Sequence, residues 1–348
     1  MKKTRTLDSS VVVRIATAGI LGLSALQAVA AEPTADALAS PDAEARANWH
    51  AFMSQNAATG EGCFQASYPS YFWEKTDCKV AQARVHPVRR QPKAGAPEIV
   101  GDGNDFAASA AGLISRAVGT FPRVTGVRSE QSIGVAAFGG GGILGANEYT
   151  LQINTNFTGT TVACAGHAGC TVWQQFIYAT DYQFQGQGAV FMQYWLIGWG
   201  AQACPRGWMS AGGGDCFRNS AIAAAADIPI TSLGQLTLTA SAVSGGNDSV
   251  VLSDAGQAIS MSARDTVVDI AQVWRQTEFN IVGDAGGSEA QFNAGSSVTV
   301  NVALTDGSNQ APQCLANSGT TGETNNLNLG ACTTAGGANP SIRFTQSN

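Results

Sequence analysis

Two consecutive segments without charged residues constrain the fold of this chain more than any other feature. They are Val172–Ala179 (VWQQFIYA) and Ala189–Trp199 (AVFMQYWLIGW), joined by a Gly- and Gln-rich link. Short runs that are rich in aromatic and β-branched residues and bounded by turn residues are typical of buried β-strands. Three amides, Gln174, Gln175 and Gln193, interrupt them. Because a buried amide without partners costs about 1–3 kcal/mol, these amides must be hydrogen-bonded or line a groove.

The same β pattern continues from Asp102 onward. Further strands are expected at Ala111–Val118, Arg123–Val127, Tyr149–Phe157, Gln235–Ala242, Ser249–Leu252, Ala258–Met261, Glu278–Val282 and Val298–Leu304. A helical turn or two fits Val267–Trp274, and four consecutive glycines predict a surface loop within Phe138–Gly145. About ten short strands separated by Gly, Ser, Asn and Asp predict an all-β fold, an antiparallel sandwich or barrel.

The first 31 residues have the three parts of a secretory signal peptide. A basic start with Lys2 and Arg5 precedes an apolar stretch, Ile15–Leu26, and a small-residue motif, Ala28–Ala30. We therefore expect residues 1–31 to be removed and the protein to be secreted, either to the extracellular space or to the periplasm. The apolar stretch is shorter than the roughly 20 residues that a membrane-spanning helix needs. No later segment is long enough, so we expect no membrane span.

The eight cysteines fall into four pairs of neighbours along the sequence. In a secreted chain this spacing favours four local disulfides: Cys63 with Cys78, Cys164 with Cys170, Cys204 with Cys216, and Cys314 with Cys332. A zinc site is a poor alternative, because the short paired spacings of zinc ligands are absent and the sequence holds only three histidines. We therefore expect structural disulfides and no bound metal.

Residues 32–98 differ in composition from the rest of the chain. Ala37–Phe52 is compatible with a helix, and after the first pair of cysteines comes a basic, proline-containing tract from Arg84 to Pro97. Two interpretations are open. The segment is either a small disulfide-stapled subdomain with an exposed linker, or a propeptide whose basic tail covers an acidic groove until it is cleaved. In both cases the β-sandwich domain spans residues 99–348.

Charge is distributed unevenly along the chain. No lysine follows Lys93, and residues 94–348 contain eight Arg against 17 Asp and Glu, a net charge of 8 − 17 = −9. We expect no nucleic-acid partner, because phosphate binding needs a basic face. With so few cations, few ion pairs can be lost when acid protonates the carboxylates. The composition therefore favours an acid-tolerant extracellular protein.

Catalysis by a serine or by a metal has little support in the sequence. His167 is the only histidine after residue 98, and no GxSxG elbow precedes a helix, so a Ser–His–Asp triad is not expected. The acidic clusters Asp102–Asp105 and Asn247–Asp248 lack the full spacing of a calcium loop, and Asx turns explain them equally well. Carboxylates and amides remain as the groups that could carry chemistry.

Glu278 is the carboxylate in the most informative context. It begins an alternating stretch within TEFNIVGD (Thr277–Asp284). If Phe279 and Ile281 face the core, Glu278 and Asn280 face the other side of the sheet, because strand side chains alternate. In a two-sheet sandwich that side is either solvent or a concave groove. A lone Glu on a strand is solvated by default, so periodicity alone does not make Glu278 functional.

The order of segments from about Ala107 to Leu304 resembles that of the eqolisin glutamic peptidases, which are acid endopeptidases. LQINTNF and its Cys loop are similar to an early strand of that family, VWQQFIYA to the strand with its catalytic Gln, and AVFMQYWLIGW to its Trp- and Tyr-rich strand. LGQLTLTASA and the Ser249–Met261 hairpin resemble its sheet-closing strands, and TEFNIVGD and EAQFNAGSSVTVNV resemble the strand with its catalytic Glu and the next one. The resemblance implies a two-sheet antiparallel concanavalin-like β-sandwich after a small N-terminal pro-like segment.

The resemblance also implies a catalytic pair that needs no metal or cofactor. Glu278 takes the position of the catalytic Glu, which activates a water molecule. Gln174 takes the position of the catalytic Gln, which stabilises the oxyanion. A shift of one residue would place Gln175 in the groove instead, because alternation lets only one of the two face it. The chain departs from the family at Gly283, where a second acidic residue is expected, with Asp284 next.

Substrate contacts are expected from Gln193, Tyr194, Trp195 and Asn154; the family's Glu in the aromatic strand appears here as Gln193 or Tyr194. The sequence therefore predicts a secreted, acid-acting endopeptidase, a monomer that cleaves polypeptides.

A glycan-binding or polysaccharide-acting protein without peptidase activity is the alternative, since one fold serves several functions. The aromatic residues that could stack on sugars are Tyr178, Tyr182, Trp195, Trp199 and Trp208. Core packing is the default role of such residues.

Overall fold

A computed structural model describes residues 41–86, 99–157, 159–200, 203–317 and 321–348. The chain divides into two compact units, Met1–Ser40 and Pro41–Asn348, and the structure describes parts of the second only. The expected signal peptide (1–31) and most of the basic tract, including Arg89, Arg90 and Lys93, lie outside the described residues.

The second unit contains two large sheets and a small one. The first sheet consists of β1 (Gly62–Ser67), β2 (Glu74–Thr76), β4 (Arg116–Thr125), β13 (Thr237–Ser241), β14 (Asn247–Ser253), β15 (Gln257–Arg264), β18 (Ser297–Thr305), β21 (Asn328–Ala335) and β22 (Ser341–Ser347), in the order β2-β1-β15-β14-β13-β4-β18-β22-β21. The second sheet consists of β3 (Phe106–Ser109), β7 (Tyr149–Thr155), β8 (Thr171–Phe184), β9 (Gln187–Ile197), β10 (Met209–Gly212), β11 (Asp215–Asn219), β16 (Gln276–Gly283) and β19 (Gln313–Ala316), in the order β10-β11-β9-β8-β7-β16-β3-β19, with β12 (Ala223–Ala226) also paired to β9. The small sheet is formed by β5 (Glu130–Gly134), β6 (Gly145–Ala146), β17 (Ser288–Phe292) and β20 (Thr324–Asn325).

The helical elements are short apart from one. They are α1 (Pro41–Gln55) and the 3-10 turns η2 (Ala136–Phe138), η3 (Val162–Cys164), η4 (Ile230–Gln235), η5 (Asp265–Val267) and η6 (Ile270–Gln272). The last two fall in or next to the stretch where one or two helical turns were expected. No helix among the described residues is both long and apolar enough to cross a membrane.

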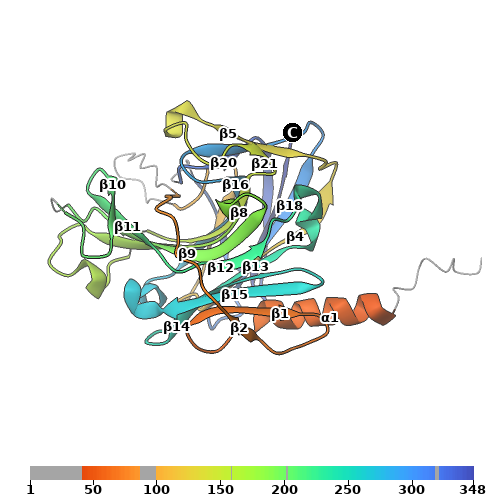
Figure 1. Ribbon diagram of the computed structural model, residues 1–348, viewed down its shortest axis with the longest axis horizontal. Coiled ribbons are helices and arrows are strands. Elements are labelled where there is room, and N and C mark those ends of the chain that lie inside the picture. Colours follow the sequence, from red (N-terminus) through yellow and green to blue (C-terminus); the bar gives the residue numbers. More distant parts are fainter. Residues whose placement is uncertain (1–40, 87–98, 158, 201–202, 318–320) are drawn as a thin grey trace, which may run out of the picture. The chain divides into compact units, whose positions relative to one another are not determined.

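The two large sheets pack face to face as an all-β antiparallel sandwich, which confirms the predicted fold class (Figure 1). The core lies between them, because one face of each sheet is apolar. On β16, Phe279 and Ile281 belong to this core, together with Ile153 of β7, Phe176 of β8 and Leu238 of the first sheet. As the alternation of side chains predicts, Glu278 therefore lies on the outer face of the second sheet, the face turned away from the first sheet.

Two predicted strands, Ala111–Val118 and Arg123–Val127, are corrected to one, β4. The strand runs from Arg116 to Thr125 and passes through Gly119 and Pro122 without a break. The pairing of β4 with β18 shifts register between Thr299 and Asn301, which is a β-bulge opposite this stretch. A bulge is one of the few places in a sheet that tolerates proline, because the extra residue needs no ladder hydrogen bond.

The link between the two central strands is shorter than the sequence indicated. β8 continues to Phe184 and β9 begins at Gln187, so only two residues separate them. The pairing shifts register between Ala179 and Phe184. Tyr182, within this extension, is fully buried.

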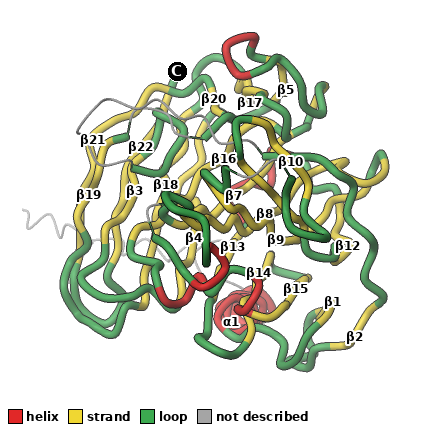
Figure 2. The backbone as a smooth tube through the Cα atoms, turned by 90° about the vertical axis from the view of Figure 1, so that its left-hand side faces the viewer, coloured by secondary structure: helices red, strands yellow, loops and turns green. Residues whose placement is uncertain are grey.

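The N-terminal part of the unit is joined to the first sheet. α1 covers most of the expected helix Ala37–Phe52 and lies next to β13, β14 and β15, as Figure 2 shows. Trp49 and Met53 are its buried apolar side chains. β1 pairs antiparallel with β15 along its whole length, from Gly62 to Ser67. Residues 62–67, in the middle of the segment 32–98, therefore extend the first sheet as an additional strand.

All four predicted disulfides are confirmed. The S–S distances range from 1.95 to 2.10 Å, and the Cα atoms of each pair lie 5.4 to 6.3 Å apart. No free cysteine is present among the described residues. Each bond closes a loop of 6 to 18 residues, as the sequence spacing indicated.

Candidate functional site

A row of polar side chains crosses the outer face of the second sheet. Glu278 of β16 pairs with Asn154 of β7, Asn154 with Gln175 of β8, and Gln175 with Gln193 of β9. Residues that pair across antiparallel strands point to the same face, so the four side chains of this polar row are neighbours. All four are at most 1% exposed. Such burial requires that their polar atoms be hydrogen-bonded to one another or to what covers them.

Glu278 lies between an amide and a second carboxyl group. Asn154 Nδ2 donates to Oε2 of Glu278 over 2.6 Å. Asp105, immediately before β3, shares a hydrogen bond with Glu278. Burial raises the pKa of Glu278 to about 7, although the hydrogen bonds from Asp105 and Asn154 lower it. Burial and the adjacent Glu278 raise the pKa of Asp105 well above its usual range. When Asp105 is protonated, its carboxyl group can donate a hydrogen bond to Glu278.

Gln175 is oriented by two hydrogen bonds. Trp195 Nε1 donates to Oε1 of Gln175 over 2.8 Å, and Gln175 Nε2 donates to Oε1 of Gln152 over 3.1 Å. Because an indole N–H can only donate, the first bond fixes which end of the amide is the carbonyl. Gln152 Oε1 also accepts a hydrogen bond from Asn154 Nδ2 over 3.3 Å. The Glu278 carboxyl and the Gln175 amide thus belong to one connected set that spans strand β7.

Gln174 lies on the opposite face of the second sheet from Glu278. Its Nε2 donates to Oδ2 of Asp248 on β14 over 3.0 Å, so the side chain lies between the two sheets. Of the two registers that the sequence left open, only Gln175 shares the face of Glu278. Gln174 as the partner of Glu278 is therefore not compatible with this geometry, because the two side chains are separated by the sheet itself.

The four residues expected to contact the substrate are also divided between the two faces of the second sheet. Gln193, Trp195 and Asn154 lie on the outer face with Glu278, as their pairing and hydrogen bonds show. Tyr194 belongs to the apolar core between the sheets. Alternation along β9 is the reason, since neighbouring residues of one strand point to opposite faces.

Residues 79–86 cover the outer face at the polar row. Figure 1 shows this stretch, without regular structure, leaving β2 and running toward β9. Lys79 forms an isolated antiparallel bridge with Ile222, and Gly286 N donates to O of Val85 over 3.0 Å. The backbone N of His86 donates to Oε1 of Gln193 over 2.9 Å. The burial of Gln193, at one end of the polar row, is therefore due in part to the segment that follows β2.

Four residues of this site had no role assigned from the sequence. They are His86, Asp105, Gln152 and Glu323. Asp105 had a signal, an acidic cluster directly before a strand, and Gln152 could have been found as the residue two positions before Asn154 on the same face. His86 and Glu323 come from segments without periodicity, and only the tertiary structure brings them to the sheet.

The acidic clusters considered for calcium have protein partners instead. Asp102 Oδ1 accepts a hydrogen bond from the backbone N of Asn104 over 2.7 Å, which is an Asx turn, and Oδ2 accepts one from Asn280 over 3.1 Å. Asp248 accepts one from Gln174. Burial raises the pKa of Asp102 and of Asp248 well above the usual range. Within the described part of the chain, no group of three or more His, Cys, Asp or Glu side chains is arranged to hold a metal ion.

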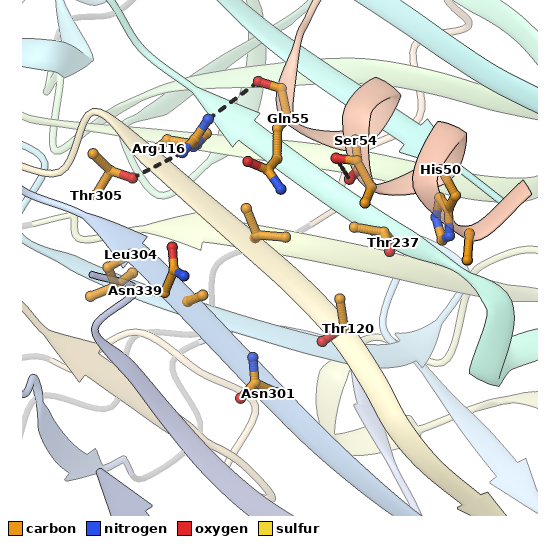
Figure 3. Close-up of a pocket in the computed structure, with 14 residues that line it drawn as sticks. His50, Ser54, Gln55, Arg116, Thr120, Thr237, Asn301, Leu304, Thr305 and Asn339 are labelled. Atoms are coloured by element: carbon orange, nitrogen blue, oxygen red, sulfur yellow. Dashed lines mark hydrogen bonds between the residues drawn. The ribbon is translucent and has the colours of Figure 1, made fainter. Parts of the chain in front are cut away.

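A surface pocket lies elsewhere, between α1 and the outer face of the first sheet (Figure 3). Arg116 of β4 donates from Nη1 to O of Gln55 over 3.2 Å and from Nη2 to Oγ1 of Thr305 over 3.4 Å. His50 of α1 also lines it, and its Nε2 lies 3.2 Å from O of Ser253. Among the described residues that line this pocket there is no carboxylate. It therefore lacks the carboxyl group that the polar row contains.

Most of the aromatic residues considered for sugar stacking are packed in the protein. Tyr178, Tyr182 and Trp195 are at most 1% exposed, which confirms the expectation of core packing for these three. Trp199 is half-buried and stacks on His167. Rings that are buried offer no flat face to a sugar, so these three do not form a glycan platform.

Comparison with known proteins gives one structural likeness. No family model matches the chain, and no curated protein matches it. Among solved structures, the chain is similar to scytalido-glutamic peptidase in complex with a transition state analog inhibitor, at 11% sequence identity and a TM-score of 0.30. The match covers 69% of this chain and 96% of that chain. A likeness at this identity and TM-score does not show what this chain does. Any function has to be argued from the geometry of the polar row.

The buried carboxyl groups predict an unusual dependence of stability on pH. Burial raises the pKa of Glu130 to about 9 and that of Glu278 to about 7, and it raises that of Asp284 well above its usual range. A carboxyl whose pKa is higher in the folded state binds protons more tightly there. Its stabilising effect is complete below the ordinary value near 4 and is lost as the pH rises through the folded pKa.

The melting temperature is therefore expected to fall by roughly 5 °C or more between pH 4 and pH 9, as these groups lose their protons. Calorimetry at pH 4, 6, 8 and 9 measures this directly. In the variant Glu130→Gln the decrease above pH 7 should become smaller, because one buried ionisation is removed. A melting temperature that rises with pH over this range would contradict the assignment of these groups as buried neutral acids.

Proposed function

We propose that this protein is a secreted endopeptidase that acts in acid and hydrolyses peptide bonds with Glu278 and Gln175. The observation that carries the proposal is the polar row, in which a carboxyl group and an oriented amide lie on one face with only β7 between them. Perturbed carboxyl groups beside polar donors are typical of catalytic sites.

Each group has one role in the proposed reaction. The Glu278 carboxylate takes a proton from a water molecule while the water oxygen attacks the scissile carbonyl carbon. The carbonyl oxygen becomes an oxyanion, which accepts a hydrogen bond from the Gln175 amide. Glu278 then returns the proton to the amide nitrogen as the C–N bond breaks, which gives a carboxylic acid and an amine. Asp105 and Asn154 hold the Glu278 carboxyl in place by hydrogen bonds.

The covering segment makes the intact chain inactive in this proposal. At pH 4 a Glu278 with a pKa of about 7 is protonated and cannot act as a base. Burial is the main cause of the raised pKa, so exposure of the outer face to water should lower it toward the ordinary value. The segment 32–98 then acts as a propeptide, the second of the two interpretations that the sequence left open.

The test compares the intact chain with a chain nicked in the basic tract at Arg89, Arg90 or Lys93. Both are incubated at pH 4 and at pH 7 with an unfolded protein, and the products are identified by mass spectrometry. We expect internal peptide bonds to be cleaved at pH 4 by the nicked chain, and at least about tenfold more slowly by the intact chain. If a nicked chain with its four disulfides intact cleaves nothing at either pH, the proposal is wrong, and binding to a glycan array becomes the next measurement.

A further inference from the structure

A histidine in the covering segment occupies a pocket beside the polar row. The ring of His86 is fully buried. It stacks on Tyr182 with ring centroids 6.0 Å apart at 18°, and its centroid lies 5.9 Å from that of Phe191. Its Nδ1 lies 2.8 Å from Oε1 of Glu323 and 3.2 Å from Nε2 of Gln152. The pocket thus offers two aromatic walls and a carboxyl group, which together suit an imidazole.

The main chain before His86 is held mostly by side-chain amides of the second sheet. Asn219 Nδ2 donates to O of Gln82 over 2.9 Å and to O of Arg84 over 3.2 Å. Gln193 donates from Nε2 to O of Arg84 over 3.1 Å and accepts from the backbone N of His86. These contacts use only main-chain atoms of the segment, which every polypeptide has. The outer face can therefore bind an extended chain of another sequence. The pocket around the His86 side chain would then determine which sequences are preferred.

A second carboxyl group, that of Asp284, lies near Glu323. Asp284 is fully buried, and neither of its carboxyl oxygens has a hydrogen-bond partner among the described residues. It interacts electrostatically with Glu323 and with Arg84 of the covering segment. Of these two carboxyl groups, that of Glu323 contacts the imidazole ring.

Gln152 connects the pocket to the proposed catalytic pair. Its Nε2 lies 3.2 Å from Nδ1 of His86 and donates to Oε2 of Glu323 over 2.5 Å. Its Oε1 accepts from Gln175 Nε2 over 3.1 Å. A side chain in the pocket and a peptide bond at Gln175 are thus separated by a single residue of the sheet, the spacing expected of a subsite within one binding groove.

We propose that the pocket formed by Tyr182, Phe191 and Glu323 is a substrate subsite that selects a histidine side chain, and that residues 82–86 occupy the groove in the intact chain as a substrate would. The inference rests on the proposed function and names its substrate class. Preferred substrates are extended polypeptides that place a histidine in this pocket.

Hydrogen exchange of the full chain tests the docking without any need for catalysis. In His86→Ala and in Glu323→Ala, exchange of the amides in residues 79–86 is expected to become at least about tenfold faster, because each change removes the contact between the His86 ring and the Glu323 carboxyl group. Exchange in β8 and β9 and the melting temperature should stay as in the wild type, and the double variant should add nothing. His50→Ala, a histidine on α1, is the matched control and should leave residues 79–86 unchanged. Faster exchange that extends through β8 and β9 would show that His86 is an ordinary core residue and would overturn the proposal.

Cleavage of a mixed peptide library by the nicked chain tests the selectivity. Cleaved peptides are expected to be enriched in histidine at one fixed distance from the broken bond, and Glu323→Ala should lose this enrichment while it still cleaves. Cleavage by the wild type without such enrichment would overturn the subsite. If the wild type cleaves no peptide, the proposed function fails, and the exchange experiment alone then decides whether the pocket holds His86 as a docked side chain.

Discussion

Gln175→Ala is expected to lower kcat/KM of the nicked chain for an unfolded protein by about 10²–10³-fold, because loss of one oxyanion donor costs about that much in other hydrolases. Gln174→Ala should stay within about threefold of the wild type, because its side chain lies on the inner face and cannot reach the bond being cleaved. Comparison of these two variants isolates the effect of the sheet face, because the two residues are adjacent and chemically identical.

Stability is expected to respond in a different way. Gln174 Nε2 donates to Asp248, and both groups are buried between the sheets. Gln174→Ala should therefore lower the free energy of unfolding by about 1–3 kcal/mol, the usual cost of leaving a buried polar group unpaired. Denaturant unfolding measures this change in stability, and the kinetic assay measures the change in kcat/KM. If Gln174→Ala loses activity while Gln175→Ala keeps it, the register of the site is wrong.

The sequence predicted the parts of this molecule that follow from local chemistry. The alternation in TEFNIVGD placed Phe279 and Ile281 inside and Glu278 outside, and cysteine spacing identified the four disulfides. Both depend on short-range geometry that is the same in any sandwich. The sequence could not show which of Gln174 and Gln175 faces the groove. Both faces of this strand are buried, so apolar residues occupy both and no polar–apolar alternation distinguishes them.

The remaining parts of the site depend on long-range packing. Glu323 and His86 are separated by more than half of the chain, yet their side chains lie 2.8 Å apart. Neither has a periodic context, because both belong to irregular segments that cover the second sheet. Asp105 was noticed, but its hydrogen bond to Glu278 depends on the pairing of β3 with β16, which the sequence does not reveal.

Glu278→Gln is the other change with a large expected effect. Glutamine keeps the size and the hydrogen bond from Asn154 but cannot accept the proton of the attacking water. We expect kcat/KM to fall by roughly 10³-fold or more, since a general base contributes about 10²–10⁴. Glu130→Gln is the matched control. Glu130 is also buried, but it lies on the small sheet, and with a pKa of about 9 it is neutral at pH 4, so its replacement should leave the rate unchanged.

The most direct test of the account is therefore the rate at which the nicked chain cleaves an unfolded protein at pH 4, measured side by side for the wild type, Glu278→Gln and Glu130→Gln. The account predicts comparable cleavage by the wild type and Glu130→Gln, and none above background by Glu278→Gln, with all three proteins equally folded. Cleavage by Glu278→Gln at the wild-type rate would show that the polar row is not the catalytic site.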